Sequence, residues 1–276
     1  MWDRTPLILA VESGNLDAVR ALLETGEVDV NAEDTWDRTA LWIAARNGCS
    51  DIARALLGRK DIEVNPHQKY WGFNEPETPL AIACYYGHAP VVQEFLADGR
   101  VNLNARDKEG LTPVHLSVSN FRSNVLSLLL AQPSIDALAP CDRGHTPLHT
   151  AAVRGNLNAL RQLLQHPHLT DPNIMTEDNW TPLGLAARFG RDGIVRALVD
   201  DGRVDINGIA GAGETALVLA AKRMRWYVVE ELLEADGVDV HRRGAEDGMS
   251  FAEIVEAGNN PKLKRLLDEK VRRECQ

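Results

Sequence analysis

The sequence has few aromatic residues, few cysteines and no long apolar run. Its cysteines lie far apart, at Cys49, Cys84, Cys141 and Cys275. This spacing excludes the usual zinc-binding patterns and the disulfide framework of a small secreted protein, so we expect reduced thiols. No apolar stretch reaches the ~18 residues of a membrane-spanning helix, and "MWDRTPLILAVESG" at the N-terminus lacks the features of a signal peptide. We therefore expect a protein of the cytoplasm or the nucleus that does not contact a membrane.

The sequence also has fewer basic than acidic residues. The chain has 30 Lys and Arg residues against 40 Asp and Glu residues, which gives a formal net charge of −10. Nucleic acids and anionic membranes are bound by surfaces with a net positive charge, so we expect neither as a partner. The sequence contains no glycine-rich phosphate loop and no GxSxG, HExxH or protein-kinase motif, so no cofactor is predicted.

What the sequence does contain is a repeated tetrad of the form Thr-Pro-Leu-x. The tetrads begin at Thr5, Thr39, Thr78, Thr112, Thr146, Thr181, Thr215 and Ser250. Successive tetrads are 34 or 35 residues apart, except for one step of 39. A period this regular predicts a stack of supersecondary units, each of which buries its apolar face against its neighbours.

Each unit is predicted to form two short helices. In the fifth unit Thr146 is suited to cap the first helix, and Pro147 fits a first helical position that needs no amide donor. Gly155 is suited to end that helix in a left-handed conformation, and the leucines of 157–164 form the apolar stripe of a second helix. The connections between units predict hairpins, each with a residue tolerant of positive φ. These residues are Asp37, Gly110, Gly144, Asn179, Gly213 and Gly248.

The segments "DRGHTPLHTAAVRGNLNALRQLLQ" and "TEDNWTPLGLAARFGRDGIVRALVDDGRVDINGIAGAGET" resemble ankyrin repeats, and the resemblance covers nearly the whole chain. It implies an all-α solenoid of helix–turn–helix units with β-hairpin fingers, forming a single elongated domain over residues 1–276. The repeats start near residues 5, 39, 78, 112, 146, 181 and 215, and a degenerate unit at 250–276 ends in a polar capping helix. The first unit begins at Met1, so we expect no dedicated N-terminal cap. The "GRVDIN" connectors are similar to those of fungal ankyrin arrays.

The step of 39 residues adds five residues to the third finger, which we expect to form an extended loop at 65–77. Pro76 stands where the other fingers carry Asp, Asn or Gly, and proline cannot supply the positive φ of a tight hairpin. This loop also holds Tyr70, Trp71 and Phe73. Exposed aromatic clusters mark contact sites, so one hypothesis is a binding surface. The alternative is that the rings fold back and fill the gap opened by the insertion.

The resemblance implies that finger tips and the ends of the first helices line a concave groove and carry the contact residues. Aromatic residues and arginines dominate binding hot spots, and arginines pair well with acidic groups. The leading hypothesis is a stand-alone, monomeric adaptor for protein–protein interaction that binds another protein or an acidic peptide. The predicted contact residues are Trp36, Arg46, Tyr70, Trp71, Phe73, Tyr85, Tyr86, Arg154, Trp180, Arg188 and Phe189. The plainer alternative is a solvated charge lattice that only stabilises the stack.

A second hypothesis is a small anionic or aromatic ligand bound beneath the 65–77 loop. In its catalytic form this would be an acid–base isomerase or cyclase of a biosynthetic pathway. The acid–base candidates are Glu77, Tyr85, Tyr86, His145 and Asp178. Nothing in the sequence fixes their mutual geometry, so enzymatic activity is not predicted. His166, His168 and Asp171 lie on one connector without a further ligand, so no metal site is predicted either.

Four residues depart from or complete the repeat pattern. Phe121 and Met224 stand where a glycine normally ends the first helix, so we expect altered or strained helix ends there. Trp226 follows closely, and this favours a local hydrophobic repacking over a binding site. His115 and His149 occupy the fourth position of the tetrad. The resemblance implies that these histidines bond to the backbone and link neighbouring units.

Overall fold

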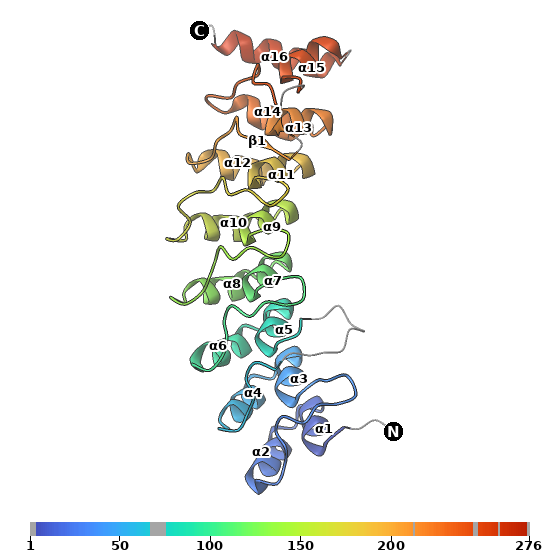
Figure 1. Cartoon of the computed structure of the whole chain (residues 1–276), viewed down its shortest axis with the longest axis vertical. Coiled ribbons are helices and arrows are strands. Elements are labelled where there is room, and N and C mark those ends of the chain that lie inside the picture. Colours follow the sequence, from blue (N-terminus) through green and yellow to red (C-terminus); the bar gives the residue numbers. More distant parts are fainter. Residues whose placement is uncertain (1–3, 67–75, 212, 245–247, 259, 275–276) are drawn as a thin grey trace. The chain divides into compact units, whose positions relative to one another are not determined.

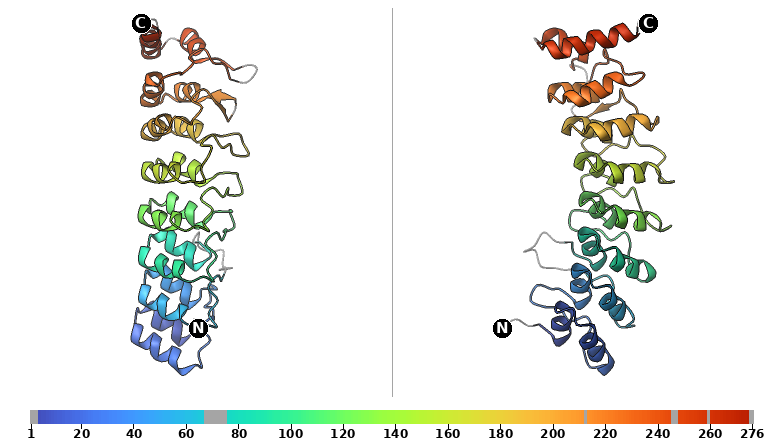
Figure 2. Two further views of the ribbon diagram at one scale, coloured as in Figure 1. Left: turned by 90° about the vertical axis from the view of Figure 1, so that its left-hand side faces the viewer. Right: turned by 180° about the vertical axis from the view of Figure 1, so that it is seen from behind.

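The computed structural model describes residues 4–66, 76–211, 213–244, 248–258 and 260–274 (Figure 1). The chain divides into two compact units, Met1–Ala137 and Leu138–Gln276. In both units the helices come in pairs whose two members lie side by side (Figure 2).

The first unit contains four helix pairs. They are α1 (Pro6–Glu12) with α2 (Leu16–Thr25), α3 (Ala40–Asn47) with α4 (Ser50–Leu57), α5 (Pro79–Tyr86) with α6 (Ala89–Ala97), and α7 (Pro113–Ser119) with α8 (Ser123–Leu130). The first helices contact one another in the order α1, α3, α5, α7, and the second helices follow the order α2, α4, α6, α8. Each pair is therefore one repeat that packs on the next.

The second unit also contains four helix pairs and one short hairpin. They are α9 (Pro147–Arg154) with α10 (Leu157–Leu164), α11 (Pro182–Phe189) with α12 (Asp192–Asp200), β1 (Ile209–Ala210) with β2 (Glu214–Thr215), α13 (Ala216–Lys222) with α14 (Trp226–Glu234), and α15 (Phe251–Ala257) with α16 (Pro261–Glu274). The contacts again run along the first helices, α9 to α15, and along the second helices, α10 to α16. The predicted capping helix corresponds to α16. None of the helices in the described part of the chain is both long and apolar enough to cross a membrane.

Threonines start the first helices, as the tetrads predicted. The Thr39 side chain, for example, accepts a hydrogen bond of 3.2 Å from the Trp42 amide, and Thr181 accepts one of 3.1 Å from Gly184. Each such bond satisfies a donor that has no partner within the helix. Paired alanines fill the contacts between first helices, and Ala151 and Ala152 are fully buried. Their small side chains let neighbouring helices approach closely.

Five of the six predicted finger residues have positive φ; the prediction for Gly248, which follows residues outside the described ranges, is not tested. Asp37 has φ of 56° and Asn179 of 59°, and Gly110, Gly144 and Gly213 are also positive. In the finger of Asp37 the buried Asp34 carboxylate accepts bonds of 2.9 Å from the Trp36 amide and 3.0 Å from the Arg38 amide. Fingers are thus held by local side-chain bonds, and the β1–β2 hairpin is the one regular two-stranded sheet among the described residues.

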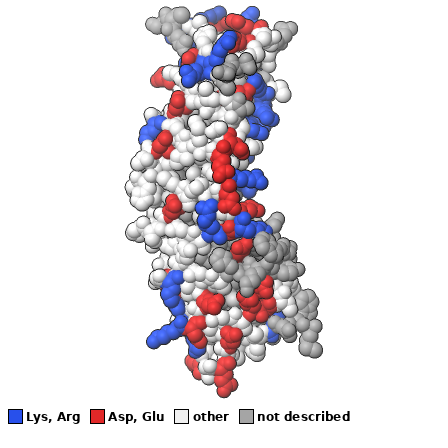
Figure 3. All heavy atoms as spheres, viewed as in Figure 1, with Lys and Arg blue, Asp and Glu red and all other residues white. Residues whose placement is uncertain are grey.

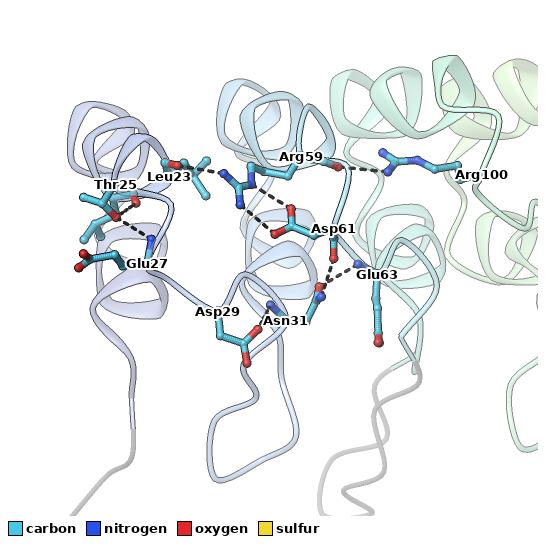
Figure 4. A network of polar contacts seen from close by, with 10 residues as sticks. Leu23, Thr25, Glu27, Asp29, Asn31, Arg59, Asp61, Glu63 and Arg100 are labelled. Carbon is cyan, nitrogen blue, oxygen red and sulfur yellow. Dashed lines mark hydrogen bonds and ion pairs between the residues drawn. The ribbon is translucent and has the colours of Figure 1, made fainter.

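An asparagine ladder joins the connectors of neighbouring repeats (Figure 4). The Asn31 side chain donates to the Asp61 carbonyl at 2.7 Å and accepts from the Glu63 amide at 2.8 Å. Equivalent paired bonds are made by Asn65 and Asn104 in the first unit and by Asn173 and Asn207 in the second. One amide side chain therefore fixes the register between two successive connectors.

Candidate functional site

A tyrosine cluster, formed by Arg46, Tyr85, Tyr86 and His88, lies at the ends of α3 and α5 in the first unit. The Arg46 guanidinium carbon is 5.5 Å from the centroid of the Tyr86 ring. Tyr85 meets Tyr86 edge to face at 5.1 Å, and His88 stacks on Tyr86 at 6.0 Å. All four side chains are partly exposed. The structure therefore brings three predicted contact residues together into one aromatic platform that carries a cation.

Glycines at the ends of these helices make room for the cluster. His88 Nε2 bonds to the Arg46 carbonyl at 2.9 Å, and its ring lies 2.7 Å from where a Cβ on Gly48 would be. Arg122 covers Gly87 in the same way and donates to the Tyr85 carbonyl at 3.0 Å. Both glycines also have positive φ, so the backbone conformation and the close approach require the same residue type.

Trp36 lies in a network of ion pairs near the first helix. The guanidinium carbons of Arg38 and Arg4 are 4.6 Å and 5.5 Å from its ring centroid. Arg38 is itself paired with the buried Asp34 at 2.6 Å and with Glu12 at 3.2 Å. Much of Trp36 is thus engaged within the chain, and only part of it is exposed.

The extended third finger is described only at its two ends. Tyr70, Trp71 and Phe73 lie outside the described residues. Pro76 lies at the C-terminal end of the loop and is buried. Its carbonyl accepts a hydrogen bond of 3.0 Å from the indole Nε1 of Trp42, a side chain that is 1% exposed. Trp42 was not identified from the sequence. A tryptophan in the tetrad "TALW", in the repeat that precedes the lengthened finger, is the signal that points to it.

A tryptophan cluster, formed by Trp180, Arg188, Phe189 and Gly211, lies in the second unit. The Arg188 guanidinium carbon is 4.7 Å from the Trp180 ring centroid and 5.9 Å from that of Phe189. The Trp180 ring lies so close to Gly211 that a Cβ there would overlap the ring atoms. The Gly211 amide also donates to the Asn179 carbonyl at 2.8 Å. Gly211 was missed in the sequence, since its role depends on a ring from the preceding finger.

His149 fixes the backbone of Trp180. Its Nδ1 accepts from the Thr146 amide at 3.2 Å, and its Nε2 donates to the carbonyls of Ile174 and Trp180, both at 3.0 Å. The ring is fully buried. This histidine links one repeat to the next through the backbone, as the resemblance implied.

The acid–base candidates are divided between the two units. Glu77, Tyr85 and Tyr86 belong to the first unit, and His145 and Asp178 belong to the second. Burial lowers the pKa of His145, and the charge of Arg143 lowers it further while Asp178 raises it. His145 is therefore neutral near neutral pH. Asp178 is exposed, as is Arg154 at the end of α9.

A cavity of about 280 Å³ lies elsewhere in the second unit, between α14 and α16. It is lined largely by charged side chains that pair with one another, including Lys262 with Glu230 at 3.0 Å and Arg265 with Glu269 at 2.8 Å. Within the described ranges no group of three or more His, Cys, Asp or Glu residues is arranged to hold a metal ion. Each unit therefore has its own candidate site, which is the aromatic cluster described above.

The helix ends at Phe121 and Met224 are strained, as predicted, with φ of 59° and 55°. The expected repacking around Met224 is wrong. Met224 is 67% exposed, while Trp226 is partly buried with the Lys262 Nζ 5.6 Å from its ring centroid. The physical reason is that a left-handed residue at a helix end directs its side chain away from the preceding turn and toward solvent.

The helix pairs, threonine caps and hairpin fingers define a repeat protein built from helix–turn–helix units. The family described as "Ankyrin repeats (3 copies)", in which one match spans three repeats, matches this chain at residues 2–68, 64–140, 80–174, 129–210 and 167–244. The chain belongs to the ankyrin repeat family, as its motifs indicated.

Two curated proteins and two solved structures illustrate the relationship. The chain is 43% identical over 60 residues to Rabankyrin-5 of Mus musculus, a match covering 22% of this chain and 5% of that protein. It is 32% identical over 163 residues to the probable 26S proteasome regulatory subunit p28 of Saccharomyces cerevisiae, covering 59% of this chain and 57% of that protein. The chain thus matches only part of the length of both relatives.

Among solved structures, the ankyrin repeat domain of Bcl-3 has a TM-score of 0.70 at 26% identity, covering 83% of this chain and 98% of that domain. The human ASB11 ankyrin repeat domain has a TM-score of 0.69 at 28% identity, covering 86% and 100%. The predicted all-α ankyrin solenoid is confirmed.

Proposed function

We propose that this protein is an interaction module that holds a partner protein against its fingers and first helices. Fold alone does not establish a function, so the proposal rests on the two clusters as well as on the family. The yeast relative is named as a probable regulatory subunit of a larger assembly, and this supports a role in binding proteins. Each unit holds one arginine-bearing aromatic platform.

The observation that carries the proposal is the stacking of Arg188 on Trp180. Trp180 is fixed by Gly211 beneath its ring and by His149 at its carbonyl, so the platform is built before any partner arrives. Arg188 forms no ion pair with any residue that the structure describes. A guanidinium held on a ring in this way is suited to take a carboxylate through two parallel hydrogen bonds. The proposed partner is therefore a protein with an acidic segment.

The tyrosine cluster supports the same function in the first unit. Arg46 lies over Tyr86, and Tyr85 and Tyr86 are each partly exposed. Arg154 adds a second exposed cation in the other unit, where it also has no ion-pair partner among the described residues. Acidic and basic side chains are interspersed on the face shown in Figure 3, so a partner meets local cations in a chain of net negative charge.

Affinity capture from an extract of the source organism tests the proposal. The baits are the wild-type protein, Arg188→Ala, Tyr86→Ala and the control Arg161→Ala, which changes an exposed arginine on the second-helix row. Proteins and small molecules in the eluates are identified by mass spectrometry. We expect a protein that is captured by the wild type and by the control, and is depleted with Arg188→Ala or Tyr86→Ala.

The proposal fails if the same proteins elute from all four baits. Enrichment of a small molecule without any protein also contradicts it. In that case the acid–base candidates of each unit become the residues to change.

A further inference from the structure

The residue at position 224 is unusual in its backbone conformation. Five first helices end at or next to a glycine of positive φ, namely Gly14, Gly48, Gly87, Gly155 and Gly190. Met224 adopts the same conformation, with φ of 55°, and Phe121 does so in the first unit with φ of 59°. Left-handed backbone is unfavourable for a residue with a side chain, and a glycine would avoid the strain.

The strain at Met224 is not offset by burial. The side chain is 67% exposed. Phe189, at the end of α11, is 41% exposed, and Tyr227, in the first turn of α14, is 77% exposed. We call these three residues the helix-end patch. Large apolar side chains gathered at a surface mark a contact site more often than isolated ones do.

Arg225 brings the helix ends at Phe189 and Met224 close together. The Arg225 Cδ lies 2.7 Å from where a Cβ on Gly190 would be, so Arg225 packs against Gly190. Arg225 follows Met224 in the sequence, and Gly190 follows Phe189. α11 also contacts α13, and α12 contacts α14. Adjacent packed helices lie roughly 8–10 Å apart, so a single extended peptide can touch both sides of this junction.

Positive charge surrounds the helix-end patch. Arg188 is next to Phe189 in the sequence, and Arg223 and Arg225 flank Met224. None of these arginines forms an ion pair with a described residue, whereas the nearby Lys222 is paired with Glu214. Asp192 is the acidic residue at the start of α12, three positions beyond Phe189. An acidic partner thus complements the local charge.

We infer that Phe189, Met224 and Tyr227 form a docking surface for an extended segment of a partner protein in which an apolar residue is flanked by Asp or Glu. This inference rests on the proposed interaction function and adds the chemistry of the partner. The apolar residue packs on Met224 and Phe189, and the acidic residues pair with Arg188, Arg223 or Arg225. In this proposal the strained backbone at Met224 lowers the stability of the fold, and the exposed side chain contributes to binding. Such a trade-off is common at functional sites.

A display library of random peptides tests the inference, because it supplies the probe even though the partner is unidentified. Peptides of about 12 residues are long enough, when extended, to cross several repeats. The library is selected on the wild-type protein, and selected peptides are then titrated against Met224→Gly, Trp180→Ala and Met175→Ala. Met175 is an exposed methionine on a connector, 54% accessible, and serves as the matched control.

We expect selected peptides to carry an apolar residue beside Asp or Glu, and to bind Met224→Gly about tenfold more weakly than the wild type. Met175→Ala is expected to bind them normally. Met224→Gly should also unfold at a temperature about 1–3 °C higher, because glycine relieves the strained backbone. Higher stability combined with weaker binding separates a contact residue from a structural one.

Four outcomes overturn the inference. Peptides without acidic residues contradict the proposed chemistry, and a lower melting temperature for Met224→Gly shows that the methionine supports the fold. Equal binding to Met224→Gly and the wild type, with loss of binding to Trp180→Ala, also overturns it but leaves the proposed function standing. If the wild type selects no peptide, the inference fails, and affinity capture then decides whether the proposed function stands.

Discussion

The indole ring of Trp180 occupies the space into which a side chain at Gly211 would extend. The ring belongs to one finger and the glycine to the next, so the tryptophan cluster depends on the packing between two successive repeats. The consequence is that the site can be altered without changing any of its exposed residues.

Gly211→Ala is expected to lower the free energy of unfolding by about 2–4 kcal/mol, because it adds a steric overlap to the cost of a left-handed alanine. It should also displace Trp180 and change its fluorescence. Gly202→Ala is the matched control, since Gly202 has φ of 73° and a Cβ added there would meet no described atom within 4 Å. Chemical denaturation that shows equal losses for both variants would contradict the predicted overlap.

Asn173→Ala is expected to cost about 1–2 kcal/mol of stability, because it removes a rung of the asparagine ladder with bonds to the Arg203 carbonyl and the Asp205 amide. Asn173→Asp keeps the acceptor but places a carboxylate oxygen against the Arg203 carbonyl and the Asp171 carboxylate, so it should cost at least as much. Asn158→Ala, which removes a bond to Gln162 one helical turn away, is the comparison. Urea denaturation at neutral pH measures the stability of all three variants. An unchanged midpoint for Asn173→Ala would show that its two bonds to the next connector do not stabilise the fold.

Trp42→Phe is expected to destabilise the protein by about 1–3 kcal/mol, because the buried Pro76 carbonyl loses its donor and a small void opens. Thermal unfolding measures the loss. Trp226→Phe changes a partly buried tryptophan at a helix start and should cost less. The reverse order of the two losses would show that the bond to Pro76 contributes little.

Stability is expected to fall as the pH drops below the ordinary histidine value of 6.5. Burial lowers the pKa of His145, and burial together with His168 lowers the pKa of His166. The unfolded chain therefore takes up these protons at a higher pH than the folded protein, and acid favours unfolding. Carboxylates with lowered pKa, such as Asp98 and Asp201, titrate below their ordinary value of 3.8 and lie outside this window.

The double variant His145→Gln/His166→Gln should show a smaller change in urea midpoint between about pH 7.5 and about pH 5.5 than the wild type. An equal change in both proteins would assign the pH dependence to other groups.

Phe121→Gly is expected to raise the stability of the protein by about 0.5–1 kcal/mol, because glycine accommodates φ of 59° without strain while losing some chain entropy. Phe121→Ala keeps the strained backbone and should give no gain. Since Phe121 is 55% exposed, little burial is lost in either variant. A loss of stability in Phe121→Gly would mean that the ring packs more tightly in solution than its exposure indicates.

Local signals made the helix pairs predictable. A threonine cap such as Thr181 and a terminal glycine such as Gly190 act within a few residues, so the sequence shows them directly. The grouping of Trp180 with Arg188 and Phe189 also followed from their offsets within one repeat. Their stacking did not, since it depends on the third dimension.

Contacts between repeats were harder to foresee. The bond between Trp42 and Pro76 and the overlap at Gly211 each join residues that lie more than 30 positions apart, and no short motif encodes them. The prediction that Met224 takes part in a local hydrophobic repacking was wrong for a related reason. The apolar character of Met224 is plain from the sequence, and only the structure shows that the side chain faces solvent.

Asn65 makes its two ladder bonds across the lengthened finger, to the Arg100 carbonyl at 2.9 Å and the Asn102 amide at 2.8 Å. Asn31, whose finger has the usual length, makes the equivalent bonds at 2.7 Å and 2.8 Å. The five additional residues are therefore absorbed between Asn65 and Thr78, and the register of the repeats on either side is unchanged. The finger is therefore a place where a loop of another length or sequence can be substituted while the register of the connectors stays the same.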